Sequence, residues 1–243
     1  ERPLSIPAGR ELEITGFPRF FGFQLQIQHA TVIDADRELY PGADYQSNAL
    51  RSVAAVRYLT TPEASGATPV IIDGVVTFAD SSWKALFVQD STGGIYVSYS
   101  TKGMSPKPGD RVTVTGVSNL GDYAPVIVAA NVIRKGRVSL PRPVPITPRD
   151  AVAGVLDSVF VEAEGVVHAL ASKQDPTHLA FSLYSSFGTI RVITSPSFGT
   201  QEQLEKIEDA TARIRGICGT IFNSRRQLVG YQLLVSNISE ITV

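Results

Sequence analysis

Three histidines, one cysteine and scattered carboxylates are the side chains of this chain that could support metal or covalent chemistry. Cys218 lies in the apolar, strand-like run 214–222, which indicates a small buried side chain rather than a nucleophile. His29 falls in a predicted strand. His168 and His178 flank a predicted loop, and no cysteine or carboxylate cluster stands near them at metal-ligand spacing. We therefore expect no metal site and no cofactor.

The short motifs of common enzyme classes are also missing from the sequence. There is no P-loop, no GxGxxG fingerprint and no GxSxG elbow. The pair Gly93-Gly94 could suggest a phosphate cradle, but no helix follows it, so a hairpin turn is the better interpretation. We expect a protein without catalytic activity, although a dispersed active site would leave no pattern in one sequence.

Aromatic, amide and basic side chains in predicted loops are better candidates for ligand binding. The single tryptophan of the chain lies in the loop between the first and second predicted strands of its repeat, and two tyrosines lie in the third. Aromatic rings beside amide and ammonium groups can stack on a sugar or a base. The predicted ligand-binding residues are Trp83, Lys84, Tyr96, Tyr99, Asn119 and Tyr123. In the alternative interpretation, Trp83 caps its own domain or packs against the next one.

An internal repeat reveals the elements that must position these residues. Residues 9–33 match residues 109–133 at a constant offset of 100, with identical residues at seven of the 25 positions. A third copy of this half repeat lies near the C-terminus, at 212–216 and 233–238. The first half of the repeat occurs only twice, beginning near Gly74 and Gly165.

Each complete repeat is predicted to hold five strands. In the better defined copy they cover 70–78, 86–89, 95–99, 111–117 and 123–133. A long first strand with a central glycine, followed by hairpin signals, is typical of a small Greek-key barrel of the OB type. The fold class is therefore mostly β, with tandem OB-like five-stranded Greek-key barrels, two complete and one N-terminal half copy, and short linking helices.

The predicted domain organisation follows from the repeat. A capped, amphipathic helix is expected at 197–208, where an OB barrel places a helix between its third and fourth strands. Another helix is expected at 47–59. The parts are a half repeat (1–37), a helical linker (38–68), a second OB-like barrel (69–137), a Pro-rich leader (138–157) and a third OB-like barrel (158–243).

The half repeat has two explanations. Upstream residues or another molecule would complete a first barrel, or residues 1–37 are a decayed hairpin that packs on the next module. The sequence leaves both open.

Motifs at 74–77, 86–97, 108–117 and 121–127 resemble OB-fold modules in the extracytoplasmic regions of bacterial sensor histidine kinases and related membrane signalling proteins. The resemblance covers most of residues 47–243. It implies a periplasmic sensory region of a two-component signal-transduction protein, tethered to the membrane through segments outside this chain. Its partner would be an unknown small molecule, an oligosaccharide or an envelope protein.

A rival resemblance leads to the alternative function. Similar motifs occur in OB modules attached to extracellular nucleases, which implies an oligonucleotide- or oligosaccharide-binding module. The last copy departs from the pattern, since Tyr184-Ser185 stands where the other copy has Gln89-Asp90. Its ligand is therefore expected to be lost or changed.

The charge of the chain bears on the choice between these functions. Lys and Arg number 22 against 23 Asp and Glu, a net charge of −1. A general binder of single strands needs a continuous basic groove with interleaved aromatics, whereas the basic groups at 134–137 and 225–226 are short. Nucleic acid is therefore possible but less favoured, a purely structural spacer is a third hypothesis, and the oligomeric state is open.

Overall fold

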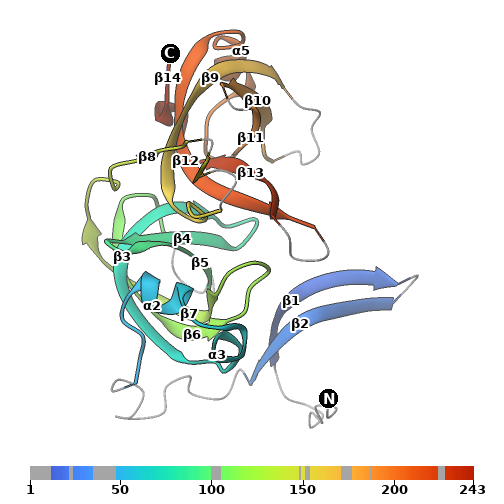
Figure 1. The fold of residues 1–243 in the computed structure, drawn as a ribbon, viewed down its shortest axis with the longest axis vertical. Coiled ribbons are helices and arrows are strands. Elements are labelled where there is room, and N and C mark those ends of the chain that lie inside the picture. The colour runs from blue at the N-terminus through green and yellow to red at the C-terminus, as the bar shows by residue number, and fades with distance from the viewer. Residues whose placement is uncertain are drawn as a thin grey trace. The chain divides into compact units, whose positions relative to one another are not determined.

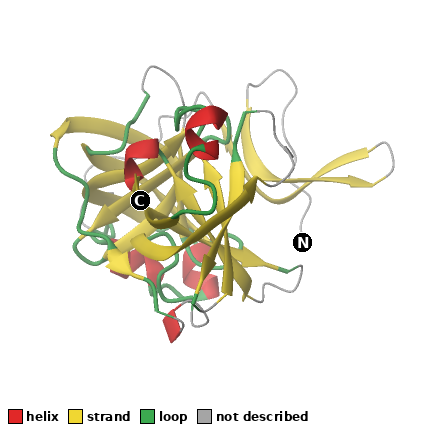
Figure 2. Cartoon of the chain, turned by 90° about the horizontal axis from the view of Figure 1, so that it is seen from above, coloured by secondary structure: helices red, strands yellow, loops and turns green. Residues whose placement is uncertain are grey.

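A computed structural model gives the fold (Figures 1 and 2). It describes residues 12–21, 24–34, 48–99, 105–147, 149–150, 154–170, 177–186, 188–223 and 228–243. The chain divides into two compact units, residues 1–48 and 49–243. Among the described residues, no helix is long and apolar enough to cross a membrane.

The first unit contains a single antiparallel hairpin. It is formed by β1 (Leu12–Phe21) and β2 (Gln24–Asp34), with an irregularity between Thr15 and Phe17. These are the two strands that the half repeat predicts. Both explanations of the half repeat remain open, and His29 lies in β2.

The second unit begins with a closed five-stranded barrel, as predicted. Its strands are β3 (Pro69–Asp80), β4 (Ala85–Asp90), β5 (Gly93–Tyr99), β6 (Asp110–Asn119) and β7 (Val126–Arg137). They close in the order β3-β4-β5-β7-β6, with β5 and β7 parallel and β6 returning to β3. This order is the Greek-key closure of an OB-like barrel.

A second barrel with the same closure follows. It is built from β9 (Phe160–Leu170), β10 (Ala180–Ser185), β11 (Gly188–Thr194), β12 (Thr211–Phe222) and β13 (Leu228–Val235). Here β11 and β13 are parallel, and β12 pairs with β9. Two short strands are added outside it: β8 (Val144–Pro145), from the Pro-rich leader, pairs with β9, and β14 (Ile241–Thr242) pairs with β12.

The helices are short (Figure 2). Of the helix predicted over 47–59, only α2 (Val53–Arg57) forms, and Ser52 is its N-cap. A second short helix, α3 (Thr61–Ser65), follows before β3 and is capped by Thr60. The helix predicted within 197–208 is α5 (Gln201–Glu205). Thr200 and Gln203 form a capping box at its start, and the 3₁₀ turn η1 (Ile238–Glu240) follows β13.

Three apolar clusters hold the second unit together. One fills the first barrel and one fills the second, each built from the inward side chains of its five strands. The third lies between the barrels, where outward-facing side chains of both meet. Its buried members are Phe78, Ala85, Phe87, Phe160, Ile217 and Leu234.

Polar and backbone contacts reinforce the junction between the barrels. The Phe160 amide donates to Gln89 Oε1 at 2.9 Å. Arg57 of α2 forms a 2.6 Å ion pair with Asp157, which also accepts a hydrogen bond from Thr220. The two barrels are therefore joined through a shared apolar cluster and through polar contacts as well as through the chain that links them.

Gly94 is the tightest point of this junction. An added Cβ would lie 1.9 Å from the Ser158 carbonyl oxygen, a backbone atom that cannot turn aside. We expect Gly94→Ala to lower the free energy of unfolding by about 1–3 kcal/mol, because the barrels must separate locally. Urea unfolding measures this, with Gly230→Ala as control, since its added Cβ would lie 4.0 Å from the Ile221 side chain. Equal stability of the two variants would contradict the close approach.

Candidate binding face of the second barrel

OB barrels usually bind ligands across their second and third strands, and in the first barrel this face is covered. Phe87 of β4 is buried in the cluster between the barrels, against Phe160, Ile217 and Leu234 of the second barrel. Tyr96 of β5 packs edge-on against Phe87, with ring centroids 5.5 Å apart. Burial raises the pKa of Tyr96, with a smaller contribution from Asp122. The predicted binding face of this barrel is therefore an internal surface.

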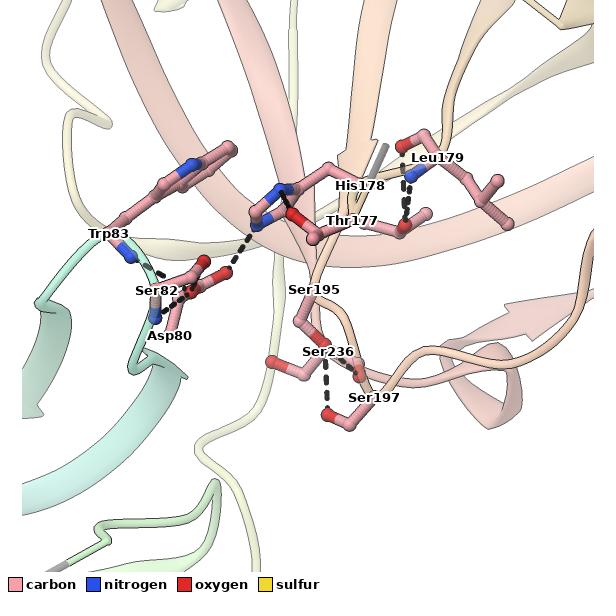
Figure 3. Close-up of polar contacts among 10 residues, drawn as sticks. Asp80, Ser82, Trp83, Thr177, His178, Leu179, Ser195, Ser197 and Ser236 are labelled. Atoms are coloured by element: carbon pink, nitrogen blue, oxygen red, sulfur yellow. Dashed lines mark hydrogen bonds and ion pairs between the residues drawn. The ribbon is translucent and has the colours of Figure 1, made fainter. Parts of the chain in front are cut away.

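The loop that carries Trp83 is held by a buried carboxylate (Figure 3). Asp80 Oδ1 accepts hydrogen bonds from the Ser82 amide, the Ser82 hydroxyl and the Trp83 amide. Its Oδ2 accepts a 2.7 Å bond from Nε2 of His178, which belongs to the second barrel. Both side chains of this ion pair are almost completely buried.

Trp83 lies directly on that histidine. The indole and imidazole rings are stacked with centroids 3.9 Å apart and planes 13° apart. This is the packing against the next module that the sequence left as the alternative, although 39% of Trp83 stays exposed. Ligand binding by Trp83 stays a prediction.

The other predicted site residues do not gather on one open surface. Tyr99 is buried in the core of the first barrel. Asn119 accepts a hydrogen bond from the Gly121 amide through its own side chain, and Tyr123 lies against Gly154. Lys84 is exposed, with a left-handed backbone of φ 51°. Ligand binding by these four residues also stays a prediction.

The equivalent face of the second barrel is only partly covered. Phe160, Ile193 and Leu234 of this barrel belong to the junction, but Val166, His168 and Arg191 of β9 and β11 are exposed. Tyr184 of β10 is 48% exposed there. The strand alternates, with Phe181 and Leu183 inward and Ser182 and Tyr184 outward, as expected of a strand with one face in solvent.

Strand register places a row of polar side chains across this face. His168, Ser182, Arg191 and Gln232 are direct neighbours on β9, β10, β11 and β13. At about 4.8 Å between strands, the row extends over roughly 14 Å, close to the length of a few nucleotides or sugars. The His168 ring also packs edge-on against Tyr184, with centroids 5.3 Å apart.

The carboxylates beside the row each lie close to a basic side chain of the same barrel. Glu162 and Glu164 of β9 form ion pairs of 2.9 and 3.0 Å with Arg215 and Arg213 of β12. Asp209 lies 3.1 Å from Nδ1 of His168. Glu162 and Glu164 are therefore each paired with an arginine of the neighbouring strand.

The arrangement offers stacking and hydrogen bonding rather than covalent chemistry. Among the described residues, no group of three or more His, Cys, Asp or Glu could hold a metal ion. Cys218 is buried in the second barrel, and burial together with the charge of Asp157 raises the pKa of its thiol to about 12. A thiol with this pKa is not a thiolate nucleophile at neutral pH.

The sequences of β4 and β10 carry a signal for this division of faces. Residues Ala85–Val88 of β4 are all apolar and all buried, which is the pattern of a strand covered on both sides. In β10 the alternation is regular and Tyr184 falls on the polar side. Comparing the two strands would have moved the candidate site from the first barrel to the second.

Comparison with known proteins adds little to this geometry. No family model and no curated protein matches the chain. A murine DNA-binding protein bound to double-stranded DNA is similar at 12% identity and a TM-score of 0.31, over 68% of this chain and 92% of that one. A HINa domain in complex with double-stranded DNA is similar at 10% and 0.33, over 68% and 90%. At these values neither likeness bears on what this chain does.

Fold and site together define the class of this protein. It is a mostly β protein with two tandem OB-like barrels fused through an apolar junction. One barrel has its usual ligand face closed by the junction, and the other has it partly open.

Proposed function

We propose that this chain is a non-catalytic binding module that holds a short single-stranded oligonucleotide on the open face of its second barrel. The observation that carries the proposal is the row of His168, Ser182, Arg191 and Gln232 beside the exposed ring of Tyr184. An aromatic ring stacks on a base, a guanidinium pairs with phosphate, and an amide and a hydroxyl hydrogen-bond base edges.

The net charge of −1 is compatible with this function because the relevant charge is local. The acids on β9 are paired with arginines of β12, so they repel a phosphate backbone less than free carboxylates would. A single arginine and a single exposed tyrosine fit a short ligand bound with modest affinity, not a long cooperative filament.

Fluorescence anisotropy with a labelled single strand of about 12 nucleotides tests the proposal at low and at moderate salt. We expect Tyr184→Ala to weaken binding by about 5–100-fold, because one base loses its stacking partner. We expect Arg191→Ala to weaken binding and to reduce the slope of log affinity against log salt by about one.

Tyr58→Ala is the matched control, since Tyr58 is 86% exposed but belongs to the end of α2 in the first barrel. Absence of binding at low salt, or equal loss in the Tyr58 and Tyr184 variants, would overturn the proposal. Competition by a neutral oligosaccharide at equal concentration would overturn it in favour of a sugar ligand.

A more specific proposal comes from the sequence resemblance, which implies a sensory function in an extracytoplasmic location. A signal passed by a change in barrel packing would have to break the apolar cluster between the barrels, so a ligand acting through the open face of the second barrel fits this structure better. A membrane segment and a kinase module encoded in the same gene would support it, and a nuclease module would replace it.

A further inference from the structure

A separate cleft opens between the two barrels, beside their apolar junction. Its volume is about 570 Å³, within the range of small-molecule sites. The first barrel lines it with Tyr99, Lys107 and Arg137, and the second with Arg215, Ser236 and Glu240. Because the junction fixes the barrels, the two walls are already in place before any ligand arrives, and little ordering is needed on binding.

The charge of this cleft is positive. Within the described part of the chain, neither Lys107 nor Arg137 has an ion-pair partner, and Arg137 is steadied by a 3.4 Å hydrogen bond from Nη2 to the Pro108 carbonyl. Arg215 also lines the cleft, but its charge is balanced by Glu162, 2.9 Å from its Nε. Glu240 is the one carboxylate among the described lining residues, and burial raises its pKa.

The cleft also offers hydroxyl groups. Ser197 lines it, and its Oγ lies 3.1 Å from Oγ of Ser195, which donates to the Ser236 carbonyl (Figure 3). Ser236 Oγ is buried and has no hydrogen-bond partner among the described residues.

We propose that this cleft binds a phosphorylated sugar, with the phosphate between Lys107 and Arg137 and the sugar hydroxyls toward Ser197 and Glu240. Two cations that have no ion-pair partner among the described residues match a phosphate dianion. A carboxylate and serine hydroxyls match the donors and acceptors of a sugar. The site is distinct from the open face of the second barrel and takes a monomeric ligand.

Calorimetric titration with ribose 5-phosphate tests this site, with ribose and inorganic phosphate as separate probes. We expect ribose 5-phosphate to bind more tightly than either probe. We expect Lys107→Ala and Arg137→Ala each to weaken binding by about tenfold, because a charge-assisted hydrogen bond is lost. Ser197→Ala should weaken it by about 2–10-fold, because the exposed hydroxyl that lines the cleft is lost.

Arg142→Ala is the matched control, since Arg142 is an exposed arginine of the same segment that does not line the cleft. No binding of ribose 5-phosphate, binding no tighter than that of inorganic phosphate, or equal loss in the Arg137 and Arg142 variants would overturn the proposal. Tyr184→Ala should bind ribose 5-phosphate normally, so failure of this site and failure of the oligonucleotide site are told apart.

Discussion

Phe160→Ala is expected to lower the free energy of unfolding of the two-barrel unit by about 3–5 kcal/mol. Phe160 is the first residue of β9, is 3% exposed and belongs to the cluster between the barrels. Truncation leaves a cavity beside Phe87 and Leu234, which cannot collapse because each is fixed in its own barrel. The loss falls on the junction rather than on either barrel core.

Urea unfolding followed by two signals measures this effect. Trp83 is the single tryptophan of the chain and stacks on His178 across the junction, so its fluorescence reports separation of the barrels. Far-UV circular dichroism reports the strands. In Phe160→Ala we expect the fluorescence to change at lower urea than the dichroism, whereas Tyr58→Ala should change neither by more than about 0.5 kcal/mol. A loss below about 1 kcal/mol in Phe160→Ala would show that the barrels are held by other contacts.

The barrels themselves could be predicted from the sequence because their signals are local and repeated. The same strand pattern occurs in two copies, so each copy independently predicts a five-stranded barrel. The capping box at Thr200 and Gln203 marks the short helix between β11 and β12. The helix predicted over 47–59 was too long. Its first residues go to the bridge of Leu50 with Val70 rather than to a helical turn.

The junction could not be predicted in the same way, because it depends on which outward faces meet. Phe87, Ile217 and Leu234 come from three strands of two barrels, and no spacing in the sequence relates them. The pairing of Asp80 with His178 spans 98 positions. The aromatic residues chosen as a ligand platform therefore included Tyr96 and Tyr99, whose rings the fold uses for packing.

His178→Ala is expected to lower the free energy of unfolding by about 3 kcal/mol at pH 7. The substitution leaves the buried Asp80 carboxylate without the hydrogen-bond partner of its Oδ2, which costs more than the pair contributes to stability when both members are present. It also removes the ring on which Trp83 stacks. His168→Ala is the matched control, since His168 is half exposed and its partner Asp209 is three-quarters exposed. An exposed pair of this kind contributes about 0–1 kcal/mol.

The cost of His178→Ala should depend on pH in a direction set by Asp80. Burial by itself raises the pKa of Asp80. Hydrogen bonds from Ser82, His178 and the Trp83 amide, together with the charge of His178, lower the pKa by more, so that the net pKa of Asp80 lies below its ordinary value. Tyr99 faces the same carboxylate, and burial together with the charge of Asp80 raises the pKa of Tyr99. A carboxyl group whose folded pKa is lowered stabilises the fold above its unfolded pKa of about 3.9. That contribution disappears as the pH falls through the folded pKa.

Urea unfolding at pH 7, 5, 4 and 3 therefore distinguishes the stability that comes from the Asp80–His178 interaction from the stability that comes from the packing of Trp83 on His178. In the variant the carboxylate lacks the histidine that lowered its pKa, so it takes up a proton at a higher pH than in the parent protein and relieves the buried charge. The difference in unfolding free energy between parent and His178→Ala should consequently be largest near pH 7 and shrink below about pH 4. A difference that is constant from pH 7 to pH 3 would mean that His178 acts only as a flat surface for Trp83. In that case, the neutral stack rather than the ion pair would join the two barrels at this point.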